Sequence, residues 1–335
     1  MSVVKKIGID LGTANSLVWE VGKGLVLNEP TVVAISVEDR KVLAVGEEAK
    51  QMLGRTPEFI IASRPMRDGV IADYEITEAM LRHFIQKVCG KFLFFRPEVM
   101  VCVPAGVTQV EQRAVLDATK NAGAKRAYLI DEPLAAAIGA KIPVAEASGN
   151  MIVDMGGGST EAAVISLGGV VAHKSVRVAG NKIDEAIAGY LRKKYNLLIG
   201  DQTAENIKIK IGSAKKFKKE KSLEIKGRDV VYGLPKSVKI SSTEVTEAIQ
   251  LPLKQILGAI KGVLEETPPE LVGDILEKGI VLSGGTSLLN KLDQFLADEV
   301  GVTFHRVEEP MVSVVKGTAL SLENLDLYKR AVRDS

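Results

Sequence analysis

Two glycine turns that each follow a carboxylate are the stretches of this sequence best suited to chemistry. In the first, Asp10 lies in an apolar run, and Gly12 and several small polar residues come after it. The segment 151–164 repeats this order without a gap, so that Asp154 matches Asp10 and Gly156 matches Gly12. A carboxylate in an apolar strand loses its hydration and needs a cation beside it. The pattern therefore predicts two strand-turn-strand hairpins, each with a carboxylate that needs a positive partner.

The backbone of these turns is suited to binding phosphate groups. Glycine permits another molecule to approach closely, and the amides of Thr13, Ala14 and Asn15 are then free to donate to phosphate oxygens. An ordinary hairpin with an Asp-capped turn would explain either stretch alone, because short glycine motifs often match by chance. The second occurrence in the same register favours the phosphate interpretation. We therefore expect two similar lobes that face one nucleotide.

A third glycine stretch, Ser283-Gly284-Gly285-Thr286-Ser287, lies between an apolar run and the start of a predicted helix. Glycines there would let a flat ring or a phosphate approach the backbone. A simple turn between a strand and a helix is the alternative, and by itself it would be preferred. Beside the two carboxylate hairpins, a role facing adenosine is the better interpretation.

Glu132 is the candidate for handling water. The segment 131–133 (Asp-Glu-Pro) follows a predicted strand at the expected edge of the cleft. A carboxylate there could orient or deprotonate the water that attacks a γ-phosphate, which is mainly a positioning task. Pro133 also suits a first helical turn, so a plain capping role for Glu132 stays open.

Glu205 and Lys208 are a second pair of charged residues with more than one interpretation. They are three residues apart in a short predicted helix and therefore share one face of it. They form either a surface ion pair or two side chains that bracket a ribose and a base.

Residues 91–97 are unusually aromatic for a loop. Phe92, Phe94 and Phe95 flank or follow Leu93 between a predicted helix and a predicted strand, and lysine and arginine residues lie nearby. Such rings would ordinarily pack under the sheet. If they are exposed instead, each ring immersed in lipid could contribute ~1.5–3 kcal/mol, and each nearby cation roughly 1 kcal/mol on an anionic leaflet. That would suffice for reversible membrane attachment, above all when many subunits bind together.

Composition restricts the remaining function classes. The chain has 335 residues, 46% hydrophobic and 26% charged, which suits a soluble globular protein of about two domains. A net charge of +2 gives no reason to expect nucleic acid. No stretch resembles a signal peptide or reaches the ~20 apolar residues that span a bilayer. Cys89 and Cys102 fit neither a metal spacing nor a disulfide framework, so we expect a reducing, cytoplasmic compartment.

The elements that position these residues follow a β-α-β-α order in the first part of the chain. Non-alternating apolar strands at 98–104 and 127–130, each followed by a helix, favour a mostly parallel sheet covered on both faces. Thr77 is the expected cap of a helix over 76–88. Further helices are expected over 107–121, 134–140, 182–195, 204–211, 243–264 and 312–322 and from about 288, with a polar tail at the end.

The internal repeat divides the chain into two lobes. We expect the first lobe to comprise residues 1–147 and 311–335, with a small inserted subdomain at about 31–74. The second lobe is expected over 148–310, with an inserted subdomain at about 197–241. Short apolar runs separated by proline and glycine residues mark the first insert.

Together these stretches resemble the actin-like ATPase superfamily and, within it, the bacterial MreB group, nearly from end to end. Residues 7–16 and 154–161 resemble the two phosphate motifs, and 282–289 resembles the adenosine motif. Residues 131–139 and 266–271 are similar to stretches that separate the MreB group from chaperones and sugar kinases. The resemblance implies an α/β, actin-like ATPase fold. It has two duplicated lobes, each with a mixed, mostly parallel sheet flanked by helices, and a nucleotide in the cleft between them.

The resemblance also implies a biological role. Proteins of this group bind ATP with Mg²⁺, hydrolyse it slowly, and polymerise into paired filaments on the inner face of the cytoplasmic membrane. There they organise the cell-wall elongation machinery and so determine rod shape. The expected location is cytoplasmic and membrane-associated. The expected partners are further copies of the chain, the membrane and that machinery.

Residue roles follow from motif position in the resemblance. Asp10 and Asp154 would hold Mg²⁺ through water, and Glu132 would position the hydrolytic water. The other implied contacts are phosphate-cradling residues (Gly12, Thr13, Ala14, Asn15, Gly156, Gly157 and Gly158), nucleoside-facing residues (Glu205, Asn206, Ile207, Lys208, Gly284, Gly285, Thr286 and Ser287) and a membrane-inserting loop (Phe92, Leu93, Phe94 and Phe95). Thr286 departs from the family, which often has a third glycine there, and its β-carbon narrows the room beside the nucleotide.

Two other functions stay open on the same fold. A small-molecule kinase would need an acidic or polar acceptor pocket, and no further Asp-rich loop supplies one. A chaperone-like or scaffold protein without turnover would have no need of Asp10, Glu132 and Asp154 together.

Overall fold

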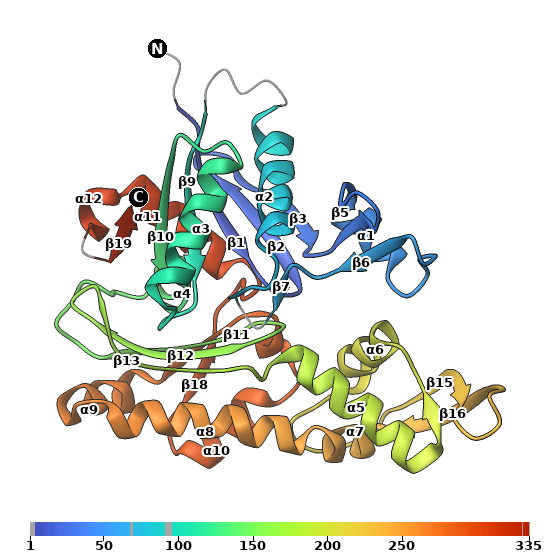
Figure 1. The fold of residues 1–335 in the computed structure, drawn as a ribbon. Coiled ribbons are helices and arrows are strands. Elements are labelled where there is room, and N and C mark those ends of the chain that lie inside the picture. Colours follow the sequence, from blue (N-terminus) through green and yellow to red (C-terminus); the bar gives the residue numbers. More distant parts are fainter. Residues whose placement is uncertain (1–3, 68–69, 91–95, 330, 335) are drawn as a thin grey trace.

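Two sheets form the framework of the molecule, one from the first part of the sequence and one from the second (Figure 1). The structure is a computed structural model that describes residues 4–67, 70–90, 96–329 and 331–334. Helices cover both sheets, and a smaller unit projects from each of them on the same side of the molecule.

The first sheet is buried on both faces along its central strands. On strand β9, Val99 and Val101 pack with helices α2 and α3, whereas Met100 and Cys102 pack with α4 and α11. This alternation explains why the sequence of the strand is almost continuously apolar. In spatial order the strands are β19 (Val332–Asp334), β10 (Arg126–Asp131), β9 (Glu98–Val103), β1 (Lys6–Leu11), β2 (Asn15–Glu20) and β3 (Gly24–Pro30), and the helices are α2 (Tyr74–Cys89), α3 (Gln109–Asn121), α4 (Glu132–Gly139) and α11 (Ser313–Glu323).

The second sheet repeats this plan. Its hairpin β11–β12 is antiparallel, like β1–β2, and β11 pairs in parallel with β17, as β1 does with β9. Both sheets are thus mixed, which confirms the expected duplicated α/β architecture. The expectation that the sheets are mostly parallel is wrong, because antiparallel pairs are at least as frequent as parallel ones among the described strands of each sheet. The strands in order are β13 (Gly169–Val176), β12 (Thr160–Ser166), β11 (Asn150–Met155), β17 (Ile280–Ser283) and β18 (Phe304–Arg306), and the helices around them are α5 (Gly180–Tyr195), α8 (Gln250–Glu266), α9 (Pro269–Lys278) and α10 (Leu292–Val300).

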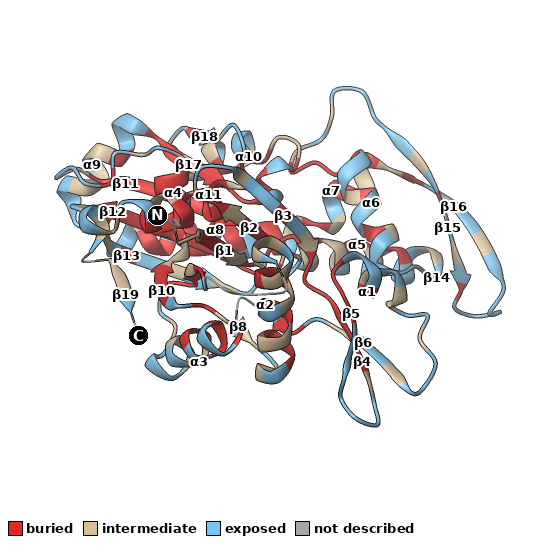
Figure 2. Ribbon diagram, turned by 90° about the horizontal axis from the view of Figure 1, so that it is seen from above, coloured by how far each residue is buried: buried red, intermediate tan, exposed pale blue. Residues whose placement is uncertain are grey.

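The projecting units are small sheets with one or two helices. Figure 2 shows that buried residues gather over the two main sheets, whereas the outer loops of the projecting units are exposed. The first unit contains β4 (Val33–Ser36), β5 (Val42–Val45), β6 (Ile60–Ser63) and α1 (Glu47–Met52), followed by the short pair β7 (Met66–Arg67) and β8 (Val70–Ile71). The second contains β14 (Leu197–Leu198), α6 (Asp201–Ile211), β15 (Ser222–Asp229), β16 (Pro235–Ser241) and α7 (Ser242–Ala248).

Two expectations about helices are wrong. The helix expected over 243–264 is broken at Ile249 into α7 and α8, and a capping box between Ser241 and Glu244 starts α7. The N-cap of α2 is Asp73, whose side chain accepts from the Ile76 amide, because Thr77 already lies inside the helix. Within the described residues, no helix is both long and apolar enough to cross a bilayer.

The expected polar tail is also wrong. After α11 the chain forms a short helix, α12 (Leu325–Tyr328), and then strand β19. This strand pairs antiparallel with β10, with Val332 opposite Ile130. A three-residue strand of mixed polarity has no alternating pattern that the sequence could reveal.

Helices α4 and α11 cross at very short range, between the two sheets. A β-carbon on Gly139 would lie 1.9 Å from the Ser313 carbonyl oxygen, and one on Gly317 would lie 1.8 Å from the Ala135 carbonyl oxygen. Only glycine fits at either position, so the two helices form one rigid layer that fixes the start of α4.

Replacing Gly317 with alanine should therefore destabilise the protein by about 3 kcal/mol or more, because neither backbone can move away without disrupting the sheets. The measurement is the free energy of unfolding from denaturant titration. Gly189→Ala is the matched control, since a β-carbon on that exposed residue of α5 meets nothing within 4 Å. It should stabilise the protein by about 0.5–1 kcal/mol. Equal stability of the two variants would contradict the close crossing.

Candidate functional site

A cleft of about 690 Å³ is lined by residues of both lobes. The turn after β1 and the turn after β11 touch across it. A β-carbon on Gly158 would lie 2.6 Å from Thr13 Oγ1, and one on Gly157 would lie 2.7 Å from Ala14 Cβ. The two carboxylate hairpins therefore share one crevice.

The first turn is held by a side chain from outside its hairpin. Thr31 Oγ1 donates to the Gly12 carbonyl at 2.6 Å and lies 2.9 Å from Ser16 Oγ. A β-carbon on Gly12 would lie 2.5 Å from the Asn15 carbonyl oxygen, so this tight turn requires glycine. Its backbone is fixed before any ligand arrives.

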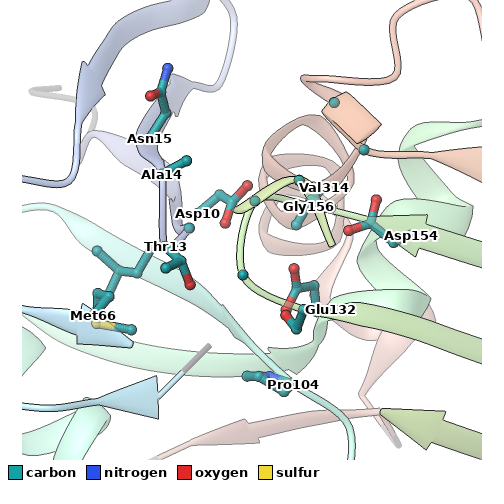
Figure 3. A pocket seen from close by; sticks show the side chains of 18 of the residues that line it. Asp10, Thr13, Ala14, Asn15, Met66, Pro104, Glu132, Asp154, Gly156 and Val314 are labelled. Carbon is teal, nitrogen blue, oxygen red and sulfur yellow. The ribbon is translucent and has the colours of Figure 1, made fainter. Parts of the chain in front are cut away.

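Three acidic side chains are directed into the space behind the turns: Asp10, Asp154 and Glu132 (Figure 3). Burial, together with the charge of Asp154, raises the pKa of Asp10 to about 7. Burial raises the pKa of Asp154 to about 6, against a smaller lowering by a hydrogen bond with Ser283. A cation between the two carboxylates would relieve both effects.

Glu132 follows β10 directly as the first residue of α4. Burial raises its pKa well above the usual value, and the charges of Asp154 and Asp10 add to the rise. Cys102 closes the floor of the cleft nearby, with its thiol 3.5 Å from Asp10 Oδ1. A carboxyl group with a raised pKa is suited to orienting water or accepting a proton from it.

The donor set fits a magnesium ion that is held mainly by a ligand and by water. Asp154 Oδ1 is buried and has no hydrogen-bond partner in the described part of the chain. Mg²⁺ usually takes one or two carboxylates, keeps several waters and binds phosphate oxygens. Among residues 4–67, 70–90, 96–329 and 331–334, no cluster of three or more His, Cys, Asp or Glu could hold a metal by itself.

One end of the cleft is built around α6, which carries Glu205 and Lys208. Lys208 Nζ donates to Asp184 Oδ2 on α5 at 2.8 Å and to the Gly180 carbonyl at 3.3 Å. Burial raises the pKa of Asp184 to about 6, although Lys208 lowers it. The ion pair of Lys208 thus joins two helices, and Glu205 lines the same wall.

The third glycine stretch closes this end. A β-carbon on Gly284 would lie 2.2 Å from the Met155 carbonyl oxygen. The segment continues as a 3-10 turn (Gly285–Leu288), and α10 starts only at Leu292, so the helix expected from about 288 begins later. Thr286 Oγ1 donates to the Gly156 carbonyl at 2.7 Å. The threonine that departs from the family pattern therefore ties the adenosine-type loop to the second phosphate-type turn.

Most of the residues proposed from the sequence line this cleft. They are Asp10, Gly12, Thr13, Ala14, Asn15, Glu132, Asp154, Gly156, Gly157, Gly158, Glu205, Lys208, Gly284, Gly285 and Thr286.

Three proposed residues do not line it. Asn206 is exposed, and Ile207 packs in the core of the second lobe because it lies on the inner face of α6. Ser287 is buried, with its hydroxyl donating to the Gly284 carbonyl. The segment Phe92–Phe95 lies outside the described residues.

Glu161 is a buried acidic residue beside Asp154 that sequence reasoning missed. It lies opposite Asp154 in the β11–β12 hairpin and is 1% exposed. Ser175 Oγ donates to it, and burial raises its pKa to about 7. The sequence did contain a signal for Glu161. The matching position of the first hairpin, opposite Asp10, holds the apolar residue Leu17. A charged residue replacing an apolar one in a repeat indicates an added role.

Several residues that line the cleft could not be recognised as such from the sequence. Asn181 at the start of α5 and an apolar wall that includes Met66, Tyr74 and Val107 come from segments far apart in the chain. Only the fold brings them together.

Asp154→Asn should stabilise the protein when nucleotide and metal are removed. The folded state raises the pKa of Asp154 from 3.8 to about 6, so ionising this group destabilises the folded state. Removing the charge should add about 1–3 kcal/mol to the free energy of unfolding above pH 6. The gain should shrink as pH falls toward 3.8, where both states are protonated. Denaturant titrations from pH 4 to 8 measure it.

Asp293→Asn, at an exposed position of α10, is the control and should show no such gain. A pH-independent effect of Asp154→Asn would contradict the proposed electrostatics.

Comparison with known proteins agrees with this geometry. The family model described as MreB/Mbl protein matches residues 4–330. The cell shape-determining protein Mbl of Bacillus cereus is 50% identical over 330 residues, which cover 98% of this chain and 99% of that protein. The cell shape-determining protein MreB of Escherichia coli K12 is 50% identical over 327 residues, with coverage of 96% and 94%.

Solved structures show the same relationship. The crystal structure of MreB 5 of Spiroplasma citri bound to AMPPNP has a TM-score of 0.92 and 36% identity, and it covers 98% of this chain and 99% of that one. The structure of a MamK double helical filament, 21% identical with a TM-score of 0.81, shares the fold. The chain therefore belongs to the MreB/Mbl family of cell shape-determining proteins and has its actin-like fold.

Proposed function

We propose that this protein binds and slowly hydrolyses ATP with Mg²⁺, and that it polymerises into membrane-associated filaments that organise cell-wall synthesis. The contact between two glycine turns above a group of buried carboxylates carries the proposal. The relative from Spiroplasma citri, solved with AMPPNP and with ADP, supports it, since it is 36% identical over nearly the whole chain.

The triphosphate would lie between the two turns. The amides of Thr13–Asn15 and Gly156–Gly158 would donate to its oxygens. Glu205 and Lys208 would flank the ribose and base on one side, and Gly284–Thr286 on the other. Ile207 and Ser287 would then act through the packing of these walls, whereas Asn206 is exposed, does not line the cleft and is given no contact with the nucleotide.

Asp10 and Asp154 would hold Mg²⁺ through water. The ion supplies positive charge that neutralises the phosphate groups. Glu132 would orient the attacking water and accept its hydrogen bond, and Glu161 adds negative charge behind Glu132. Positioning of this kind, without a covalent intermediate, is the main task of proteins that catalyse phosphoryl transfer.

Self-assembly would use surfaces on both lobes. Closure of the cleft would change the position of these surfaces relative to one another. We propose lobes comprising residues 1–147 with 311–335, and 148–310, with their inserts at about 31–74 and 197–241. Large apolar side chains are exposed on both projecting units, among them Phe59 and Ile61 on the first and Val231, Tyr232 and Leu234 on the second. Exposed apolar groups of this kind favour contact with another protein surface, and a further copy of the chain is the proposed partner.

Glu132→Ala should lower ATP turnover about 100-fold, because the variant has no group to orient the water. Nucleotide affinity should stay within about threefold, since the phosphate-binding turns are unchanged. Phosphate release and binding of a fluorescent ADP analogue measure the two effects, and sedimentation with ATP tests assembly.

Normal turnover in this variant would contradict the role of Glu132. Transfer of phosphate to a metabolite, in place of water, would favour a kinase. A wild-type protein that stays monomeric at every concentration, with or without lipid, would contradict the filament proposal.

Membrane attachment is proposed through the segment Phe92–Phe95. Phe94→Asp should weaken flotation with anionic liposomes about tenfold or more, from the loss of one inserted ring, while ATP affinity stays unchanged. Leu276→Asp is the control, because Leu276 is an exposed apolar residue on α9 and belongs to no surface proposed for assembly. Unchanged liposome binding of Phe94→Asp would mean that the ring packs in the core.

A further inference from the structure

Strand β19 contacts the segment that carries Glu132, although it belongs to none of the motifs above. Arg333 Nη2 donates to both carboxylate oxygens of Asp131, at 2.8 and 3.0 Å. Asp131 is the last residue of β10 and directly precedes Glu132. Arg333, in the last strand of the chain, is thus linked through Asp131 to Glu132, the residue expected to position water.

The strand register explains the contact. Arg333 lies opposite Leu129 in the antiparallel pair β10–β19. In such a pair a long side chain reaches the diagonal neighbour two positions along the partner strand, on the same face. That neighbour of Arg333 is Asp131. The ion pair is therefore set by backbone pairing, and its place depends on the whole of β19.

Among the residues that the structure describes, Arg333 is the side chain that donates to the carboxylate of Asp131. Asp131 is the N-cap residue of α4, yet its side chain makes no capping hydrogen bond. An N-cap aspartate ordinarily accepts from the amides of the first helical turn. With 17% exposure at Asp131 and 39% at Arg333, the ion pair is partly shielded from water. Its hydrogen bonds to Arg333 hold the point where β10 turns into α4.

Arg333 also balances charge at this end of the cleft. Asp131 contributes to the raised pKa of Glu161, and Glu161 contributes to that of Glu132. Without Arg333, the carboxylate of Asp131 would add an uncompensated charge beside buried acidic groups, which is strongly unfavourable. The first turn of α4 would be expected to shift to expose Asp131 to water.

We propose that Arg333 is a positioning residue for ATP hydrolysis: through Asp131 it fixes the first turn of α4 and so the placement of the Glu132 carboxylate. The inference rests on the proposed hydrolysis. Nucleotide binding does not depend on it, because the phosphate-type turns and the nucleoside walls belong to other elements.

The test compares Arg333→Ala and Arg333→Lys with wild type and with Arg126→Ala. Arg126 is exposed at the other end of β10, away from α4, and so provides a matched control. Arg333→Ala should lower kcat about five- to tenfold and leave KM for ATP and ADP affinity within about twofold. Arg333→Lys should restore most of kcat, and Arg126→Ala should resemble wild type. Adding Asp131→Asn to Arg333→Ala should cause no further loss, because the pair acts as a unit.

A second readout does not depend on turnover. The backbone amides of Glu132 and of Leu134–Ala136 should exchange with deuterium faster in Arg333→Ala than in Arg126→Ala, and Pro133 has no amide hydrogen to report. Normal kcat in Arg333→Ala would overturn the proposal, as would a loss that lysine does not relieve and that accompanies a lower unfolding temperature. If wild type itself releases no phosphate, the proposed hydrolysis fails. In that case, equal amide exchange in Arg333→Ala and Arg126→Ala would contradict the claim that Arg333 fixes the first turn of α4.

Discussion

The burial of four neighbouring carboxylates is the constraint that organises this molecule. Asp10, Asp154, Glu132 and Glu161 lie where burial disfavours their charged forms, and their pKa values are raised accordingly. Bringing such groups together costs free energy that apolar packing elsewhere has to offset. A bound cation and a polyphosphate with its own counter-ions would turn this unfavourable arrangement into a binding site.

The packing that offsets this cost lies directly beneath the carboxylates. Ile152 and Ile165 of the second sheet pack in one apolar cluster with Leu134 and Ile138 of α4 and with Val314 of α11. The two lobes thus share an apolar layer between their sheets, and the helix that carries Glu132 is part of it. Any movement of one lobe against the other would have to pass through this layer, and it would therefore act on the helix that carries Glu132.

The repeated hairpins and the cleft between them could be predicted from the sequence, because glycine and aspartate spacing is a local signal. The faces of short helices could not. Ile207 lies between two cleft-lining residues of α6 and yet points into the core, since one residue of helix turns the side chain by about 100°. The prediction that Ser287 lines the cleft was wrong for a related reason. Its segment forms a 3-10 turn in which the Ser287 hydroxyl donates to the Gly284 carbonyl.

The pairing of strands far apart in the chain was the other feature that the sequence did not predict. Strand β19 is too short and too polar to be recognised, and its partner β10 lies about 200 positions earlier in the chain. The ion pair of Arg333 with Asp131 could not be expected without that pairing. Glu161, by contrast, could have been predicted by comparing the two hairpins position by position, because the matching position of the first hairpin holds the apolar residue Leu17.

The close crossing of α4 and α11 also bears on how the chain folds during synthesis. Strands β11 to β18 occupy the continuous stretch 150–306, so the second lobe has all its strands once that stretch has left the ribosome. The first lobe begins earlier but lacks α11 until residues 313–323 emerge, and the alanine-rich face of α4 stays uncovered meanwhile. The half of the protein that is made first is therefore expected to be completed last. During that interval its apolar face is a surface on which a chaperone could act.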